Sequence, residues 1–402
     1  MRIRGSALLA SVLAFVGAGA HAQFSDGAVR IGILNDQSGL YEALTGRGSV
    51  IAARMAIEDA GGTVGGRPVE VVIGDHQNKA DIGASLARRW IDEERVDAIF
   101  DVPNSAVAIA VLEVARQKNR VVGFSGPVSP ALTGAQCAPT AFSWTWDTFS
   151  LANTTARALV VAGMKNWYFV TLDSAAGAAM EGDARRVVES GGGKVLGGVK
   201  HPLNISDFSS FLLQAQASKA QVVALANAGA DTVNAIKQAA EYRLTERGQK
   251  VASLLLTIND VHGLGLPAAK GVVTAESFYW DLDDETRAWT KRFQAQYGGP
   301  ANMVHAGVYS VVLHYLKAAK AANTDDSATV AAKMKELPVN DFYTKNVKVQ
   351  PNGRLPRDMY LFEVKSPTES KGAWDYYRLV GKVPGQQAYR PAEESGCPLV
   401  KK

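Results

Sequence analysis

An asparagine–serine pair stands at the start of a predicted helix, where it could bind an anion. Asn104 and Ser105 follow the apolar run 97–100, and an amphipathic stretch covers residues 105–117. A serine hydroxyl and the free backbone N–H groups of a first helical turn together form an anion site. Ser105 could equally be a plain helix cap, and the sequence leaves both interpretations open.

Further polar loops follow other predicted strands. Ligands of open α/β sheets bind outside the carboxyl ends of the strands, so these loops are candidate binding segments. They cover residues 37–41, 75–78, 102–105, 125–129, 173–177, 227–231 and 257–262, and they contain Tyr41, Gly126, Pro127, Ser129 and Asn227. Aromatic residues lie where the chain is expected to pass between two lobes, and they could form core or site: Trp144, Trp146, Phe278, Tyr279 and Trp280.

The elements that position these loops alternate between two patterns. Short β-branched runs predict strands buried on both faces, and the amphipathic stretches between them predict helices, which together indicate βαβ units. Strands are expected at 31–34, 69–73, 97–100, 121–124, 167–172, 194–199, 221–226 and 253–257. Helices are expected at 46–60, 82–93, 105–117, 177–190, 207–216, 231–241, 285–297, 306–322 and 328–336. Near the C-terminus we expect a hairpin of 347–349 with 359–364, and a further strand at 374–380. The fold class is therefore α/β, with two lobes.

The first 22 residues have the layout of a secretory signal peptide. Arg2 and Arg4 precede the apolar run 7–19, and Ala20-His21-Ala22 supplies a small-x-small cleavage site after Ala22. The run is shorter than the roughly 20 residues that span a bilayer, so we expect an exported chain that is not inserted in the membrane. The net charge of +4 falls to +2 after cleavage, which gives no electrostatic case for nucleic acid.

The chain has two cysteines, Cys137 and Cys397. In an exported protein an even pair predicts one disulfide, here tying the C-terminal tail to the first lobe. The alternative is two unpaired thiols.

Motifs for cofactors and catalysis are not supported. The glycines at 61–66 and 191–193 follow predicted helices and precede strands, so they suit helix C-caps better than phosphate loops. The sequence has no Gly-x-Ser-x-Gly, His-Glu-x-x-His or Cys-x-x-Cys motif, and its six histidines show no metal-ligand spacing. We therefore expect no cofactor, no metal and no enzyme activity.

The ordered segments along the chain resemble the periplasmic substrate-binding proteins of ABC transporters, of the leucine/isoleucine/valine-binding type. The resemblance rests on Val29-Arg30-Ile31-Gly32-Ile33, Ala53-x-x-Ala56-Ile57-Glu58-Asp59-Ala60, Asn104-Ser105-Ala106-Val107-Ala108, Pro130-x-Leu132-Thr133 and Ile236-Lys237-Gln238-Ala239. It implies the type I periplasmic binding fold: two Rossmann-like lobes with parallel sheets, three crossovers and a ligand cleft between the lobes. Lobe one would hold residues 23–145 and 276–345, lobe two 146–275 and 346–385, and 386–402 would form a C-terminal tail.

The resemblance also implies roles for individual residues. Ser105 would meet the ligand carboxylate, helped by the loop 126–129, in which Val128 or Ser129 faces the ligand. An acid for a ligand ammonium would fall at Asn259 or Asp260. Amino-acid binders often carry an aromatic residue where this chain has Ala176, which leaves a roomier pocket here.

The aromatic residues bear on the class of ligand. Trp146, Tyr279 and Trp280 at the rim would stack on a flat ring. We therefore expect an aromatic or similarly bulky carboxylate slightly ahead of leucine, isoleucine or valine.

The sequence thus predicts a monomeric periplasmic binding protein that delivers a small carboxylate to a membrane permease. One alternative is the ligand-sensing protein of a receptor system. A secreted α/β hydrolase or amidase is a weaker one, because no nucleophile with an oriented base is visible.

Overall fold

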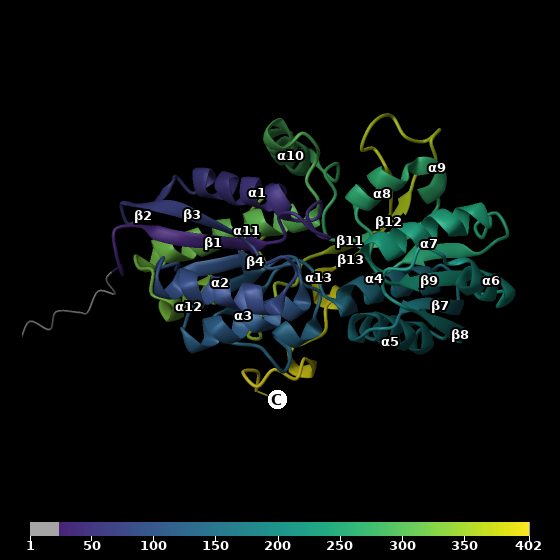
Figure 1. The fold of residues 1–402 in the computed structure, drawn as a ribbon, viewed down its shortest axis with the longest axis horizontal. Coiled ribbons are helices and arrows are strands. Elements are labelled where there is room, and N and C mark those ends of the chain that lie inside the picture. Colours follow the sequence, from purple (N-terminus) through teal and green to yellow (C-terminus); the bar gives the residue numbers. More distant parts are fainter. Residues whose placement is uncertain (1–23, 402) are drawn as a thin grey trace, which may run out of the picture.

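A computed structural model describes residues 24–401 as two α/β lobes lying side by side (Figure 1). The expected signal peptide at 1–22 lies outside the described residues. Each lobe is an open sheet covered by helices, which confirms the predicted fold class. Among the described residues no helix is both long and apolar enough to cross a membrane.

The first lobe is built on a six-stranded sheet in the order β2-β3-β1-β4-β5-β6. All neighbours are parallel except the short β2–β3 pair. Its strands are β1 (Val29–Asn35), β2 (Thr63–Val64), β3 (Arg67–Asp75), β4 (Ala98–Asp101), β5 (Val121–Phe124) and β6 (Ala141–Ser143). Every residue of β4 and β5 is buried, as expected for parallel strands covered on both faces.

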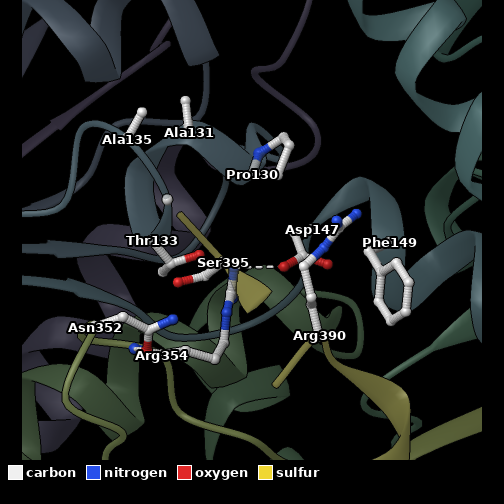
Figure 2. Close-up of a pocket in the computed structure, with 11 residues that line it drawn as sticks. Pro130, Ala131, Thr133, Ala135, Asp147, Phe149, Asn352, Arg354, Arg390 and Ser395 are labelled. Atoms are coloured by element: carbon white, nitrogen blue, oxygen red, sulfur yellow. Dashed lines mark hydrogen bonds and ion pairs between the residues drawn. The ribbon is translucent and has the colours of Figure 1, made fainter. Parts of the chain in front are cut away.

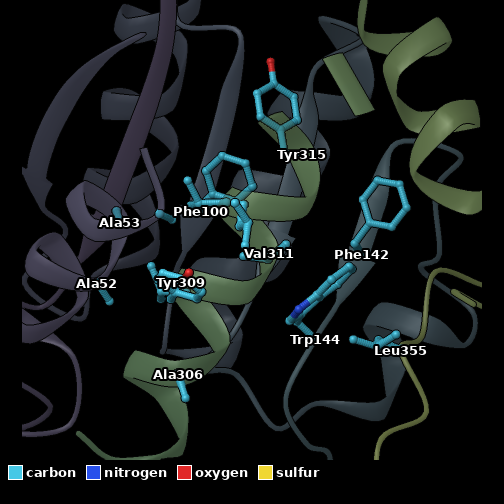
Figure 3. Packing of buried hydrophobic residues seen from close by; sticks show 14 of the residues in the cluster. Ala52, Ala53, Phe100, Phe142, Trp144, Ala306, Tyr309, Val311, Tyr315 and Leu355 are labelled. Carbon is cyan, nitrogen blue, oxygen red and sulfur yellow. The ribbon is translucent and has the colours of Figure 1, made fainter. Parts of the chain in front are cut away.

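Helices from distant parts of the chain cover this sheet. One face packs against α2 and α3, and the other packs against α1 and α11. The helices are α1 (Gly46–Asp59), α2 (Ala80–Asp92), α3 (Ser105–Gln117), α10 (Asp284–Tyr297), α11 (Met303–Ala322) and α12 (Ser327–Glu336). Figure 3 shows α11 in this core, where the rings of Phe100 and Tyr315 meet edge to face at 5.5 Å. Burying a large apolar side chain in such a core stabilises the fold by about 1.5–3 kcal/mol.

The second lobe carries a seven-stranded sheet in the order β13-β12-β11-β10-β9-β7-β8. Strands β7–β11 run parallel, and β12 and β13 are antiparallel additions at one edge. Its strands are β7 (Asn166–Leu172), β8 (Lys194–His201), β9 (Val222–Ala226), β10 (Lys250–Ser253), β11 (Val273–Glu276), β12 (Met359–Val364) and β13 (Tyr377–Val383). Its helices are α4 (Thr148–Val161), α5 (Ala175–Ser190), α6 (Ser209–Ala217), α7 (Gly229–Glu241), α8 (Ile258–Leu264), α9 (Leu266–Ala269) and α13 (Gly385–Ala388).

Three segments connect the lobes. They are residues 144–147, residues 277–283 and the segment between α12 and β12. The last of these departs from the expectation. The sequence analysis assigned residues 346–356 to the second lobe. In the structure Leu355 lies in the first-lobe core, and the backbone of Arg354 forms an isolated parallel β-bridge with Ser143 of β6. This crossing therefore occurs just before Met359.

Two sequence predictions about strands were wrong. Met359–Val364 does not form a hairpin with 347–349, because it is sandwiched between β11 and β13, while Val347 pairs with Val339. The strand expected at 253–257 is found at Lys250–Ser253. Leu254 and Leu256 are fully buried beyond the end of this strand. The apolar run that predicted the strand therefore includes part of a buried loop.

The helix C-cap prediction was correct for Gly61 and Gly62 and wrong for Gly65 and Gly66, which form the turn between β2 and β3. Gly61 and Gly62, with φ of 84° and 70°, follow the end of α1 in the left-handed region that favours glycine.

Candidate functional site

A cavity of about 280 Å³ lies between the lobes, at the carboxyl ends of strands from both sheets. This volume is close to the lower limit of small-molecule sites, roughly 300–1,000 Å³. The lining residues are Leu40, Tyr41, Ala43, Leu44, Pro103, Asn104, Ser105, Ala106, Gly126, Val128, Trp146, Leu172, Ala176, Met180, Ala228, Gly229, Leu255, Thr257, Asn259 and Asp260. Within residues 24–401 this lining includes one acid and no lysine, arginine or histidine.

The N-terminus of α3 forms part of the first-lobe wall. Asn104 caps the helix, because its Oδ1 accepts hydrogen bonds from the backbone N–H of Ala106 at 2.9 Å and of Val107 at 3.3 Å. Ser105 is therefore the first helical residue and not the cap. Its hydroxyl makes no hydrogen bond to any other described residue, so it is available at the cavity, beside the positive end of the helix dipole.

The turn between β4 and α3 has a strained backbone, and it places the N-terminus of α3 at the cavity. Asp101 and Val102 have φ of 84° and 48°, a region that non-glycine residues rarely occupy. Asp101 is fully buried, and its Oδ2 accepts a hydrogen bond from Asn35 Nδ2 at 3.0 Å. Burial raises the pKa of Asp101 to about 7. Sequence reasoning missed this turn, since nothing in the residue types marks the backbone angle.

A buried carboxylate shapes the loop that carries Tyr41. Asp36 is fully buried and accepts hydrogen bonds from the backbone N–H of Gly39 and Tyr41, both at 2.8 Å. The loop is thereby folded over the cavity, where Leu40 and Tyr41 belong to the lining.

The loop at 126–129 lines the cavity through only two of its residues. Gly126 packs so close to Pro103 that a Cβ on it would lie 2.6 Å from the proline Cα. Val128 lines the cavity, whereas Pro127 and Ser129 do not. The Ser129 hydroxyl instead caps the 3₁₀ helix Pro130–Thr133 by accepting from the Ala131 N–H at 3.3 Å. The structure thus selects Val128 over Ser129 as the cavity-facing residue.

The second-lobe wall carries the charge. Asp260 lies in the first turn of α8, where its Oδ2 accepts from both the N–H and the hydroxyl of Thr257 at 2.8 Å. Its other oxygen makes no hydrogen bond to a described residue, and burial raises its pKa. Glu276, fully buried, accepts from Tyr377 at 2.7 Å, and burial raises its pKa well above the usual value. Glu276 is not among the lining residues, so Asp260 is the acid at the cavity.

Three expected ligand contacts are used elsewhere. Asn227 is fully buried and bonded to His201 and Thr232, so it belongs to the second-lobe interior. Tyr279 and Trp280 are not among the lining residues. Tyr279 Oη and Trp280 Nε1 both donate to a backbone carbonyl of the loop between β12 and β13. Trp146 does line the cavity, and its Nε1 donates to the Gly126 carbonyl at 2.8 Å.

The two walls touch at the rim of the cavity. Asn302, the cap of α11 in the first lobe, donates through Nδ2 to Asn259 Oδ1 at 3.0 Å and to the Leu44 carbonyl at 3.0 Å. Asn259 therefore belongs to the lining and to the contact between lobes.

A second cavity, of about 320 Å³, lies beside the first crossover, because Asp147 is one of its lining residues (Figure 2). A buried ion pair lies at its edge: Arg354 contacts Asp147 at 2.8 Å, and it also donates to the Trp146 carbonyl at 2.9 Å. The C-terminal tail forms one side of this cavity and ends in the Cys137–Cys397 disulfide. The predicted disulfide is thus confirmed.

The fold and the interlobe cavity define a class of ligand-binding protein, and residues 28–373 match the family described as "Periplasmic binding protein". The chain belongs to this family.

Particular relatives can be named. A periplasmic binding protein from Burkholderia mallei is 47% identical, with a TM-score of 0.87 over 93% of this chain and 100% of that chain. A branched-chain amino acid ABC transporter periplasmic ligand-binding protein from Burkholderia xenovorans is 39% identical, with a TM-score of 0.88 over 92% and 99%. A Leu/Ile/Val-binding protein homolog from Brucella melitensis is 26% identical over 73% of this chain and 75% of its own length. These relatives are solute-binding proteins.

Proposed function

We propose that this protein is the periplasmic solute-binding component of an ABC importer and that it binds an α-amino acid with a compact apolar side chain. The observation that supports this most directly is the division of polarity across the cavity. The α3 N-terminus and the Ser105 hydroxyl suit a carboxylate, and Asp260 on the facing wall suits an ammonium group.

The state of Asp260 favours a ligand that carries a positive charge. A buried carboxylate with an unused oxygen is costly unless a cation or donors pair with it. With no basic side chain among the lining residues that the structure describes, the ligand itself would supply the cation. An α-ammonium group would also lower the pKa that burial has raised.

The remaining lining suits an apolar body. Leu40, Leu172, Met180 and Leu255 contribute aliphatic surface. The expected preference for an aromatic acid relied on the room left by Ala176 and on stacking by Trp146, Tyr279 and Trp280. Tyr279 and Trp280 lie outside the cavity, so we favour the amino acid. An aromatic acid remains the second candidate, since Trp146 and Tyr41 line the cavity.

Calorimetry with four ligands tests the proposal. L-leucine carries both charges, 4-methylpentanoate lacks the ammonium, 3-methylbutylamine lacks the carboxylate, and 4-hydroxybenzoate is a flat acid. We expect heat of binding from L-leucine and strongly reduced affinity for both single-charge analogues. Equal or tighter binding of 4-methylpentanoate or 4-hydroxybenzoate would contradict the amino-acid proposal and favour the second candidate.

Delivery to a permease and a periplasmic location complete the proposal. The family membership and the signal-peptide layout of residues 1–22 support both. Stimulation of a reconstituted transporter's ATPase by the ligand-loaded protein tests delivery. A protein that instead acts on a membrane receptor would leave every such transporter unstimulated.

A further inference from the structure

The loop between β12 and β13, residues 365–376, lies on the outer rim of the second lobe beside α8 (Figure 1). We call it the rim loop. Its Trp374 has a φ of 71°, which is unusual for a bulky residue. Two hydrogen bonds hold this conformation, because Tyr279 Oη and Trp280 Nε1 donate to the Trp374 carbonyl at 3.1 and 2.8 Å. The second crossover therefore fixes Trp374.

The indole of Trp374 stacks on the helix that carries the cavity acid. Its ring lies 3.9 Å from the imidazole of His262, with an interplanar angle of 11°. His262 belongs to α8, two residues after Asp260 and three after Asn259. Tyr376, in the same loop, bonds through its hydroxyl to His262 Nδ1 at 2.8 Å. The rim loop and α8 thus form one packed unit.

The same indole reaches the other lobe. Gly299 lies between α10 and α11 of the first lobe, and a Cβ on it would lie 3.4 Å from Trp374 Cζ2. Gly299 is buried, and Asn302, which donates to Asn259 across the rim, follows three residues later. The Trp374 indole against Gly299 and the hydrogen bond from Asn302 to Asn259 are therefore two neighbouring contacts between the lobes.

We propose that Trp374 is a positioning residue that holds the two lobes closed over the cavity and slows the release of ligand. The indole couples α8 to the first lobe, and Tyr279 and Trp280 keep it in place. The absence of a side chain at Gly299 gives the indole room to lie against the first-lobe backbone. The effect on release rests on the proposed function, whereas the effect on closure does not require a ligand.

Interlobe distances measured on the ligand-free protein test closure. Spin labels on Lys291→Cys and Glu241→Cys, exposed on α10 and α7, report the separation of the lobes. We expect Trp374→Ala to shift the distance distribution to longer values. Gly299→Leu should do the same from the opposite lobe by displacing the indole. Trp374→Phe should retain most of the closed population, because a ring can still stack.

Stopped-flow release of L-leucine tests the consequence for binding. Loss of an aromatic contact should raise koff of Trp374→Ala roughly three- to tenfold with little change in kon. Lys371→Ala is the control, since it changes only an exposed side chain of the same loop. Its distances and koff should stay at the wild-type values.

The outcomes separate the two proposals. Unchanged distances in folded Trp374→Ala and Gly299→Leu would overturn the closing role of Trp374. Lengthened distances in a protein that does not bind L-leucine would support that role and contradict the amino-acid function. A variant that melts early without any change of interlobe distance would give Trp374 a purely structural role in the second lobe.

Discussion

The two walls of the interlobe cavity differ in the charge that they present. The first-lobe wall offers a hydroxyl and a helix N-terminus at Ser105, and its lining residues within 24–401 carry no formal charge. The second-lobe wall offers a carboxylate at Asp260. Backbone dipoles can stabilise an anion without a buried cation, while an ammonium group needs an acid or several acceptors. On the proposed function, each lobe provides one half of the recognition, so we expect neither lobe alone to bind tightly.

The largest expected effect comes from the second-lobe wall. Asp260→Asn removes the charge and keeps the shape, so L-leucine affinity should fall by about 2–5 kcal/mol, the usual loss for a buried charge pair. Calorimetry measures it. Asp173→Asn is a suitable control, because this acid of the same lobe is exposed and outside the lining. If Asp260→Asn bound L-leucine with wild-type affinity, Asp260 would not contribute to binding, and the contrast between the two walls would not hold.

The strained turn under the first-lobe wall predicts a pH dependence. The pKa of Asp101 is about 7 in the folded chain and roughly 3.9 when unfolded. The folded state therefore binds the proton more tightly, and this group's contribution to stability falls as pH rises from 4 to 7. At roughly 1.4 kcal/mol per pKa unit, the change is on the order of 4 kcal/mol.

Asp101→Asn should remove this group's share of the slope, since asparagine tolerates positive φ and carries no titrating proton. Part of the slope should persist, because burial also raises the pKa of Asp97 to about 7. Urea unfolding at pH 4.5 and pH 7 measures the change. Asp81→Asn, an exposed substitution on α2, should retain the wild-type profile. A variant profile at Asp101 as steep as the wild type would assign the pH dependence to other groups.

Ser105→Ala should weaken L-leucine binding by about 1–3 kcal/mol, because a buried charged acceptor loses a donor. The free energy of unfolding should hardly change, since Asn104 caps the helix. Calorimetry and urea unfolding on the same variant separate the two effects. Unchanged affinity would leave the backbone N–H groups alone to bind the carboxylate.

The smallest effect is expected at the cap itself. Asn104→Ala should lower the free energy of unfolding by about 1 kcal/mol, the usual cost of a lost N-cap. Its effect on binding should be smaller than that of Ser105→Ala if the hydroxyl meets the ligand directly. The reverse order would show that the cap matters for the ligand more than the hydroxyl does.

Much of the fold was predictable because apolar runs report burial directly. The helix at 105–117 has the predicted bounds, and the loops after β1, β4 and β5 reach the cavity as expected. Side-chain direction was less accessible. Ser129 and Val128 are adjacent, and the capping bond of Ser129 to Ala131 accompanies the placement of Val128 at the cavity. The periodic pattern of apolar and polar residues does not indicate which of two adjacent side chains faces the cavity.

The aromatic residues illustrate a second limit. Tyr279 and Trp280 lie at a crossover, as predicted, yet their polar atoms bond to Trp374, more than 90 residues along the chain. Asn227 likewise follows a strand, but its side chain forms a hydrogen bond with His201 inside the second lobe. A strand-end position predicts proximity to a site, and the partner that a polar group finds depends on distant segments.

The disulfide gives the molecule an unusual response to proteolysis. Cys137 and Cys397 are 260 residues apart, so the covalent ring they close contains the whole second-lobe sheet and all three crossovers. A single protease cut in this ring, for example in the exposed rim loop, leaves both fragments in one molecule. The nicked protein should migrate as one species without reductant and separate into two only after the disulfide is reduced.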